Sequence, residues 1–320
     1  MIRPFTTTLP SRPIAALLFL AALSPAPAAA QAPSLDALAI RLAAMTAVSG
    51  FERAMADSLL ILLPGAERDR AGNVVLTLGS GEPRSLIACP IDEPGFVVGG
   101  IRPDGYLTLR RAGPSPGPLA DQQLEGQRVT LFGRRGPVQG VVGVRSTHLT
   151  RGRTVGEAPF TFDDAYVDVG ADSASQVATL GLEVLAPVAR TKAPHRFGEG
   201  LLAAPVAGRR AACAALVIAS RSAHPSRGSV TLAFVVEQSF TRRGLLALAR
   251  TSGPFASAVL LEARAAEPAT SPPSPDSDNL HGYEVWGLKV RYGGTQVETV
   301  SLGEAVALER RLESRIGGGE

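Results

Sequence analysis

The sequence predicts an α/β domain into which a small β domain is inserted. Helical patterns alternate with apolar strand patterns on either side of a β-rich middle, which is typical of an α/β host. In that middle, residues 101–188 hold short β segments separated by Gly and Pro, which indicates a small barrel or sandwich. We therefore expect residues 31–100 and 193–320 to form one discontinuous domain, with residues 101–192 as the inserted domain.

The N-terminal part predicts two helices followed by two strands. Ser34 is a suitable N-cap for an amphipathic helix, and a turn at residues 48–50 separates that helix from the next one. The second strand is expected to be buried and parallel because its apolar run is continuous. The expected elements are helices Leu35–Met45 and Phe51–Leu63 and strands Asn73–Leu78 and Leu86–Ile91.

The rest of the chain predicts the inserted strands and then the second half of the host. Ser301 and Glu304 form a capping-box pattern before the last helix, and residues 265–278 predict an irregular loop because they are rich in Pro, Ser and Ala without periodicity. The inserted strands are expected at Tyr106–Arg110, Arg128–Phe132, Val138–Val144 and Tyr166–Val169. The later elements are expected to be strands Leu201–Ala204, Val230–Val236, Ala256–Leu261 and Tyr283–Tyr292 and helices Arg210–Arg221, Leu245–Arg250 and 302–314.

Residues 1–30 have the pattern of a secretory signal peptide. Arg3 and Arg12 precede the apolar run Ile14–Leu23, and small residues follow it up to an expected cleavage near Gln31. The run is too short to span a bilayer comfortably, and no second long apolar run follows. The mature protein is therefore expected in the periplasm or outside the cell, without a transmembrane segment.

The charge and cysteine content predict neither a nucleic-acid partner nor a thiolate metal site. The formal net charge of +3 falls to +1 when Arg3 and Arg12 leave with the signal peptide, so no strong positive charge remains. The only cysteines, Cys89 and Cys213, each lie in an apolar segment. An oxidising compartment would permit a bridge between them, but we expect two buried, unpaired thiols.

An acidic pair follows the buried strand that ends at Ile91. Asp92 and Glu93 stand where a parallel strand of an open α/β sheet presents its carboxyl end, which is where such sheets hold their sites. The alternative is a simple turn at the end of the strand, for which Pro94 and Gly95 would supply the bend.

Several short motifs occur in one order along the chain. They are V-S-G-F-E at residues 48–52, D-R-A-G-N at 69–73, A-C-P-I-D-E-P-G-F at 88–96, G-V-V-G at 140–143, V-D-V-G-A-D-S at 167–173 and H-R-F at 195–197. In this order the chain resembles the two-metal glutamyl aminopeptidases, a family that includes the tetrahedral (TET) deblocking aminopeptidases. The resemblance implies a mixed-sheet, zinc-aminopeptidase-like domain, of the phosphorylase/hydrolase-like type, with an inserted small β-barrel.

The resemblance also implies two divalent ions held by His and carboxylate ligands, with a Glu as general base. The matching positions lack these donors. The first His position is Pro90, the bridging Asp falls on Ala207 or Gly208, the Glu-Glu pair falls on Gln238 and Ser239, and the last His position is Gly294.

We therefore expect an inactive relative, a pseudopeptidase with a binding or assembly role and no cofactor. Four retained carboxylates, which with Gln238 form the vestigial site, would line an acidic cleft able to accept a peptide amino terminus: Asp92, Glu93, Glu237 and Glu262. Peptides or a protein partner are the expected ligands, and the family resemblance implies a homo-oligomer assembled through the inserted domain.

Two catalytic alternatives remain open. In the first, relocated ligands among the retained carboxylates bind zinc or cobalt, and the protein is an active aminopeptidase. In the second, Ser146 and His148 serve as a nucleophile and its base, although neighbouring residues on a strand or turn seldom aim at each other. The other histidines, His195, His224 and His281, are expected to be surface or hydrogen-bonded residues.

Overall fold

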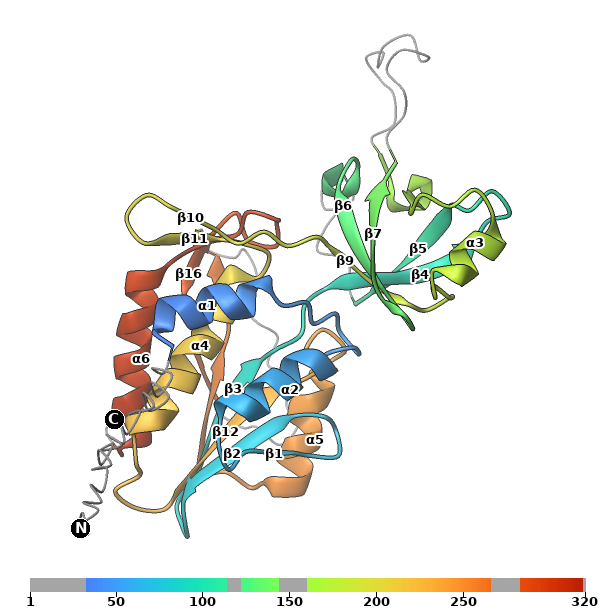
Figure 1. Cartoon of the computed structure of the whole chain (residues 1–320). Coiled ribbons are helices and arrows are strands. Elements are labelled where there is room, and N and C mark those ends of the chain that lie inside the picture. Colours follow the sequence, from blue (N-terminus) through green and yellow to red (C-terminus); the bar gives the residue numbers. More distant parts are fainter. Residues whose placement is uncertain (1–32, 114–121, 144–159, 266–282, 319–320) are drawn as a thin grey trace, which may run out of the picture. The chain divides into compact units, whose positions relative to one another are not determined.

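A computed structural model describes residues 33–113, 122–143, 160–265 and 283–318 of the chain. The predicted signal peptide, the pair Ser146 and His148, His281 and the predicted loop after Ala265 lie outside these residues. Within them, the predicted fold class is confirmed, because an α/β assembly with a mixed sheet carries a closed β-barrel (Figure 1).

The main sheet has six strands in the order β1-β2-β12-β3-β13-β15. Strand β3 lies parallel to β12 on one side and to β13 on the other, and β15 is parallel to β13. The remaining pairs, β1 with β2 and β2 with β12, are antiparallel, so the sheet is mixed. The strands are β1 (Glu67–Arg68), β2 (Val74–Gly79), β3 (Arg84–Pro90), β12 (Ser229–Val235), β13 (Ser257–Leu261) and β15 (Glu284–Trp286).

Helices cover both faces of the main sheet. One face packs on α1 (Leu35–Ala44), α2 (Arg53–Leu62), α4 (Ala207–Ser222) and α6 (Leu302–Ile316) in a single apolar core. The other face packs on α5 (Arg243–Ser252) through Leu245 and Leu248. The predicted caps form as expected, because the Oγ atoms of Ser34 and Ser301 accept hydrogen bonds from the first turns of α1 and α6.

The barrel strands follow the order β4-β5-β8-β7-β6-β9, and the barrel has its own apolar core. Its strands are β4 (Gly95–Ile101), β5 (Leu107–Ala112), β6 (Arg128–Gly133), β7 (Gly136–Val142), β8 (Tyr166–Asp168) and β9 (Pro187–Arg190). The short helix α3 (Ala174–Thr179) and two 3₁₀ turns, Gln122–Leu124 and Phe162–Asp164, complete it. Because β4 begins five residues after β3 ends, the pair Asp92 and Glu93 lies on the link between the main sheet and the barrel.

Five further strands form a second, separate sheet in the order β10-β11-β17-β16-β14. Its strands are β10 (His195–Phe197), β11 (Leu201–Ala203), β14 (Arg264–Ala265), β16 (Lys289–Arg291) and β17 (Thr299–Ser301). No helix of the described residues has the length and apolar character that a membrane crossing requires.

The prediction of one continuous strand over Tyr283–Tyr292 is wrong. The chain forms β15 in the main sheet, turns at Gly287, and then forms β16 in the second sheet. The turn passes so close to the main chain that a Cβ built on Gly287 would lie 1.6 Å from the carbonyl oxygen of Glu262. Apolar alternation along the segment does not encode this change of sheet, so the pattern predicted one strand.

Candidate functional site

The vestigial residues gather at the carboxyl-terminal edge of the main sheet. The link after β3 supplies Asp92, the loop after β12 supplies residues 237–239, and the end of β13 supplies Glu262. Because these strands are parallel, their ends meet at one edge. Side-chain contacts connect the three segments: Asp92 Oδ2 accepts from the backbone N–H of Ser239 at 2.9 Å, and Gln238 Nε2 donates to Glu262 Oε1 at 2.9 Å.

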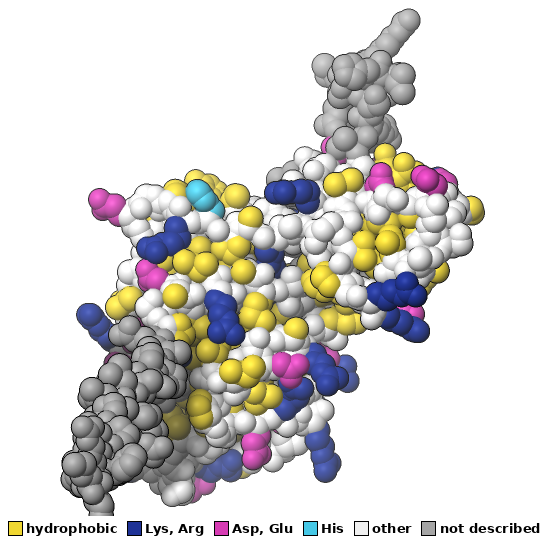
Figure 2. Space-filling view, viewed as in Figure 1, with side chains coloured by type: hydrophobic (Ala, Val, Ile, Leu, Met, Phe, Trp, Pro, Cys, Tyr) yellow, Lys and Arg dark blue, Asp and Glu magenta, His cyan; other side chains and the backbone are white. Residues whose placement is uncertain are grey.

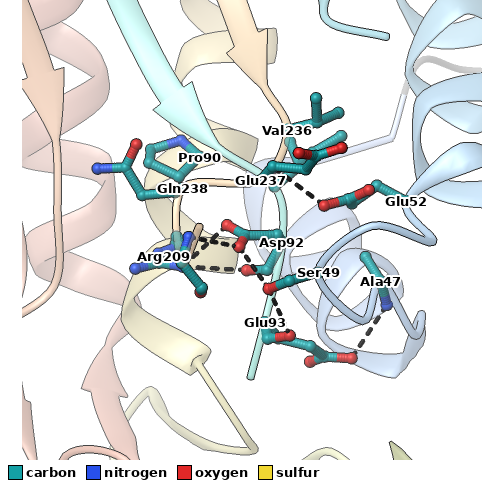
Figure 3. Close-up of polar contacts among 12 residues, drawn as sticks. Ala47, Ser49, Glu52, Pro90, Asp92, Glu93, Arg209, Val236, Glu237 and Gln238 are labelled. Carbon is teal, nitrogen blue, oxygen red and sulfur yellow. Dashed lines mark hydrogen bonds and ion pairs between the residues drawn. The ribbon is translucent and has the colours of Figure 1, made fainter. Parts of the chain in front are cut away.

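Asp92 is fully buried and saturated with hydrogen bonds (Figure 3). Besides Ser239, Oδ2 accepts a 2.6 Å hydrogen bond from Ser49 Oγ, which belongs to the turn between α1 and α2. Its other oxygen, Oδ1, lies 3.4 Å from Nη1 of Arg209. The carboxylate is therefore held by three segments of the chain and has its own internal cation.

Arg209 spans the two carboxylates at this edge. Its Nη1 also donates to the main-chain oxygen of Asp92 at 3.0 Å, and its Nη2 lies 3.4 Å from Glu262 Oε2. The side chain comes from the first turn of α4, which begins at Ala207 and not at Arg210 as the sequence predicted. A guanidinium group thus lies between carboxylates that the sequence placed in a vestigial metal site.

Glu93 points to a different set of cations. Its Oε2 is ion-paired with Nζ of Lys192 and lies 3.3 Å from Nη2 of Arg210, while Oε1 accepts from the N–H of Ala47 at 3.0 Å. Burial alone would raise the pKa of Glu93, but the two cations and the N–H lower it below its usual range. Burial among cations lowers the pKa of Lys192 to about 8.

Glu237 also has a cationic partner, since its Oε2 lies 3.0 Å from Nη1 of Arg243. Its backbone has a φ of +52°, an uncommon left-handed conformation for this residue type, and its N–H donates to Glu52 Oε1 at 3.0 Å. All four carboxylates predicted to line an acidic cleft are therefore paired with basic side chains of the chain itself.

Buried Glu298 joins two of the positions that the resemblance matches to metal ligands, Gly208 and Gly294. Its Oε1 accepts from the N–H of Gly208 and its Oε2 from the N–H of Gly294, both at 3.0 Å. Burial raises the pKa of Glu298, against the lowering effect of these two N–H groups. The two positions are thus connected through a carboxylate, each oxygen of which accepts a backbone hydrogen bond.

The residues present do not fit the two-metal centre that the family resemblance implies. Pro90 has no donor atom, and a Cβ at Gly208 would lie 2.4 Å from Val290 Cγ1 and 3.1 Å from Ala263 Cβ, so this position has no space for an aspartate. Asp92 and Glu262 are engaged with Arg209. Within the described ranges, no three His, Cys, Asp or Glu side chains lie together in a way that could hold a metal ion.

Cys89 and Cys213 form a disulfide, so the prediction of two unpaired thiols is wrong. The bridge joins β3 to α4 with a Cα–Cα distance of 5.7 Å. Burial in apolar segments is common to free and bridged cysteines, so the sequence pattern could not separate the two states. The bridge fastens the strand that leads to Asp92 to the helix that carries Arg209.

Sequence reasoning gave no role at the site to five polar residues of this region, although two of them belong to the motif at residues 48–52: Ser49, Glu52, Lys192, Arg209 and Glu298. A signal for Arg209 existed, because two arginines stand at the start of a helix, where the dipole disfavours cations, in a segment without acids. Of the histidines, His195 lies on exposed β10 and stacks on Phe197, away from these residues.

Comparison with known proteins gives relatives among aminopeptidases. SgcX of Escherichia coli, a protein assigned as an aminopeptidase, is 31% identical over 246 residues, which cover 74% of this chain and 62% of SgcX. The lysyl aminopeptidase of Pyrococcus furiosus is 28% identical over 207 residues, covering 62% of this chain and 57% of that enzyme. The chain therefore spans less than two thirds of the length of either relative.

Solved structures of peptidases share this fold. The TET1 peptidase of Pyrococcus horikoshii, which can assemble into a tetrahedron or a large octahedral shell, matches with a TM-score of 0.77 at 20% identity and covers 89% of this chain and 100% of its own. The family model of the M42 glutamyl aminopeptidases matches residues 72–239, more than half of the chain. The chain therefore belongs to the M42 glutamyl aminopeptidase family.

Proposed function

We propose that this protein is an exported, non-catalytic member of the M42 family, a pseudopeptidase kept for binding or assembly. The observation that carries the proposal is the position of Arg209, whose guanidinium lies 3.4 Å from both Asp92 and Glu262. That group already supplies positive charge to these carboxylates, and it would repel a divalent cation at the same place. The proposal includes no metal cofactor.

Loss of donors supports the same conclusion independently of Arg209. Metal-assisted hydrolysis needs several ligands and a free base near the bound water. Here four positions matching the ligands carry Pro90, Ala207 or Gly208, Ser239 and Gly294, whose side chains offer one hydroxyl in total. Glu237, the carboxylate nearest to the position of the family's base, is paired with Arg243.

Export is supported by the N-terminal pattern and by the disulfide. Residues 1–30 read as a cleavable signal peptide, and disulfides persist in the periplasm and outside the cell but seldom in the cytosol. The intact mass of protein recovered from the periplasm or the medium tests this part of the proposal. A chain beginning near Gln31 is expected, and a full-length chain retained in the cytosol would contradict it.

A homo-oligomer built through the inserted barrel is the form of assembly that we propose. The TET1 peptidase of similar fold assembles into closed shells, which is the support for this suggestion. On the face shown in Figure 2, Lys and Arg side chains are dispersed over the surface and do not form one patch, in keeping with a partner other than nucleic acid.

Metal content and peptidase activity, measured on the same preparation, test the central proposal. The mature protein is incubated with zinc, cobalt or manganese, desalted and analysed by elemental mass spectrometry, and its cleavage of aminoacyl chromophores is followed. No retained metal and no cleavage are expected. The lysyl aminopeptidase of Pyrococcus furiosus, treated identically, is the positive control.

Retention of two metal ions per chain together with turnover would overturn the proposal. It would mean that relocated ligands rebuild the centre and that the protein is an active aminopeptidase.

A further inference from the structure

A pocket of about 660 Å³ lies next to the vestigial site. Its walls come from the turn before α2, the first turns of α2, the end of β12 and two barrel residues. Most of the lining is apolar and includes Val48, Phe51, Phe132, Pro187 and Val236. A concave apolar pocket of this size is suited to a small organic molecule.

One polar group in the pocket wall is a carboxylate that is 6% exposed, that of Glu52. Its Oε1 accepts a hydrogen bond from the N–H group of Gly50 at 2.9 Å. It also accepts one from the N–H group of Glu237 at 3.0 Å (Figure 3). Oε2 receives no hydrogen bond from any other residue in the part of the chain that the structure describes, and no Lys or Arg there pairs with it. Burial raises the pKa of Glu52, against the lowering effect of the N–H groups.

The other charged residues of the lining have partners of their own. Asp57 is ion-paired with Arg68 and lies 3.9 Å from Nε of Arg53, while Glu237 is paired with Arg243. Among the described residues, none of these arginines is ion-paired with Glu52. A ligand that carries a cation on an apolar body would pair with the carboxylate of Glu52 and would fill the apolar part of the pocket.

We propose that this pocket binds a small organic amine, with its ammonium on Oε2 of Glu52 and its apolar body against Val48, Phe51 and Phe132. An ammonium at that oxygen would offset the cost of burying the carboxylate, and a charge-assisted hydrogen bond would hold it. The proposal rests on the binding role proposed above and names its ligand class. It does not involve Asp92 or Glu262.

Isothermal titration with three related probes tests the assignment. 2-Phenylethylamine carries both the charge and the apolar body, 2-phenylethanol lacks the charge, and ethylamine lacks the ring. Binding of 2-phenylethylamine is expected. 2-Phenylethanol should bind at least about tenfold more weakly because it loses the charge-assisted contact, and ethylamine at least about tenfold more weakly because it buries no ring. Phenylalanylglycinamide is the fourth probe, and tighter binding by this probe would assign the amine to a peptide amino terminus.

Glu52→Gln is the matched variant, because an amide keeps the size and the acceptor for the two N–H groups but removes the charge. It is expected to weaken binding of 2-phenylethylamine and phenylalanylglycinamide at least about tenfold, while the exposed substitution Glu304→Gln leaves their binding unchanged. If Glu52→Gln fails to fold, Ala54→Trp replaces it, since Ala54 is exposed on α2 and lines the pocket. Filling the pocket with that ring is expected to abolish amine binding.

No heat from 2-phenylethylamine or from phenylalanylglycinamide at millimolar concentration would overturn the amine site, as would equal binding of these probes by wild type and Glu52→Gln. These outcomes are separate from those of the metal and cleavage assays. A protein that binds no amine and cleaves no peptide loses only this inference, whereas one that cleaves peptides contradicts the proposed function.

Discussion

Arg209 and Arg210 are sequence neighbours on the first turn of α4, yet they serve different carboxylates. Arg209 contacts Asp92 and Glu262, whereas the buried guanidinium of Arg210 lies beside Glu93. Cations are unfavourable at a helix N-terminus, so each arginine depends on these partners for its position. The two side chains therefore supply positive charge from the polypeptide to three buried or partly buried carboxylates.

Replacing Arg209 by Met should lower the free energy of unfolding by about 3 kcal/mol, because Asp92 is fully buried and would lose its internal cation. Arg243→Met is the matched control. Its guanidinium pairs with Glu237 but is 75% exposed, so a loss below about 1 kcal/mol is expected. Urea denaturation of both variants measures the difference, and equal losses would show that Arg209 is not a structural counter-ion.

Glu52→Gln should stabilise the protein at neutral pH and not at acid pH. The pKa of Glu52 is raised above its usual value of 4.5 by burial, so the ionised form is disfavoured in the folded protein. That penalty is absent below pH 4.5, where the carboxyl is protonated in both states, and it grows as the pH rises through the folded-state pKa. Denaturation at about pH 3 and about pH 7, on either side of the usual Glu range, checks this. A stability difference that does not change with pH would contradict it.

Among the elements, the segment from β15 to β16 depends on one small residue. A Cβ on Gly287 would meet the carbonyl oxygen of Glu262 at 1.6 Å, so backbone must move to admit it. Gly287→Ala is expected to lower the free energy of unfolding by about 3 kcal/mol. In Gly293→Ala the new methyl would lie 3.7 Å from Val290 Cγ2, an ordinary contact, and the same thermal or urea unfolding experiment should show little change. Comparable losses in both variants would contradict the close approach.

Local sequence signals predicted most elements but not their partners. Caps and periodicity located α1 and α6, and the continuous apolar run predicted β3 as a buried parallel strand. The change of sheet at Gly287 was not predictable, because it is caused by the backbone of a residue 25 positions earlier. That Pro90 and Gly294 have no donor atom in their side chains is a fact of the sequence itself, whereas the contacts of Arg209 required knowing that α4 starts three residues early.

At the scale of the whole molecule, the barrel is fastened to the main domain where the chain enters and leaves it. Glu93 precedes β4 and Lys192 follows β9, and their buried ion pair joins residues 99 positions apart in the sequence. Lys192 Nζ also donates to the carbonyl oxygen of Met45 at 2.6 Å. The family motifs predicted the insertion, but a lone lysine after it carried no signal of this contact.

The disulfide encloses the same insertion. Cys89 lies in β3 before the barrel and Cys213 in α4 after it, so the bridge closes a loop of 124 positions that contains all six barrel strands. A bridge around so long a loop removes much conformational freedom from the unfolded chain. The double substitution Cys89→Ala with Cys213→Ala is therefore expected to lower the free energy of unfolding by about 2–5 kcal/mol.

Urea denaturation of the oxidised wild type, the wild type under a reducing agent and the double variant checks this. The last two should agree, because both lack the cross-link. Alkylation of the unreduced mature protein followed by mass spectrometry should find no free thiol. Free thiols in folded protein, or equal stability of all three samples, would show that the loop around the barrel is held by packing and by the Glu93–Lys192 pair alone.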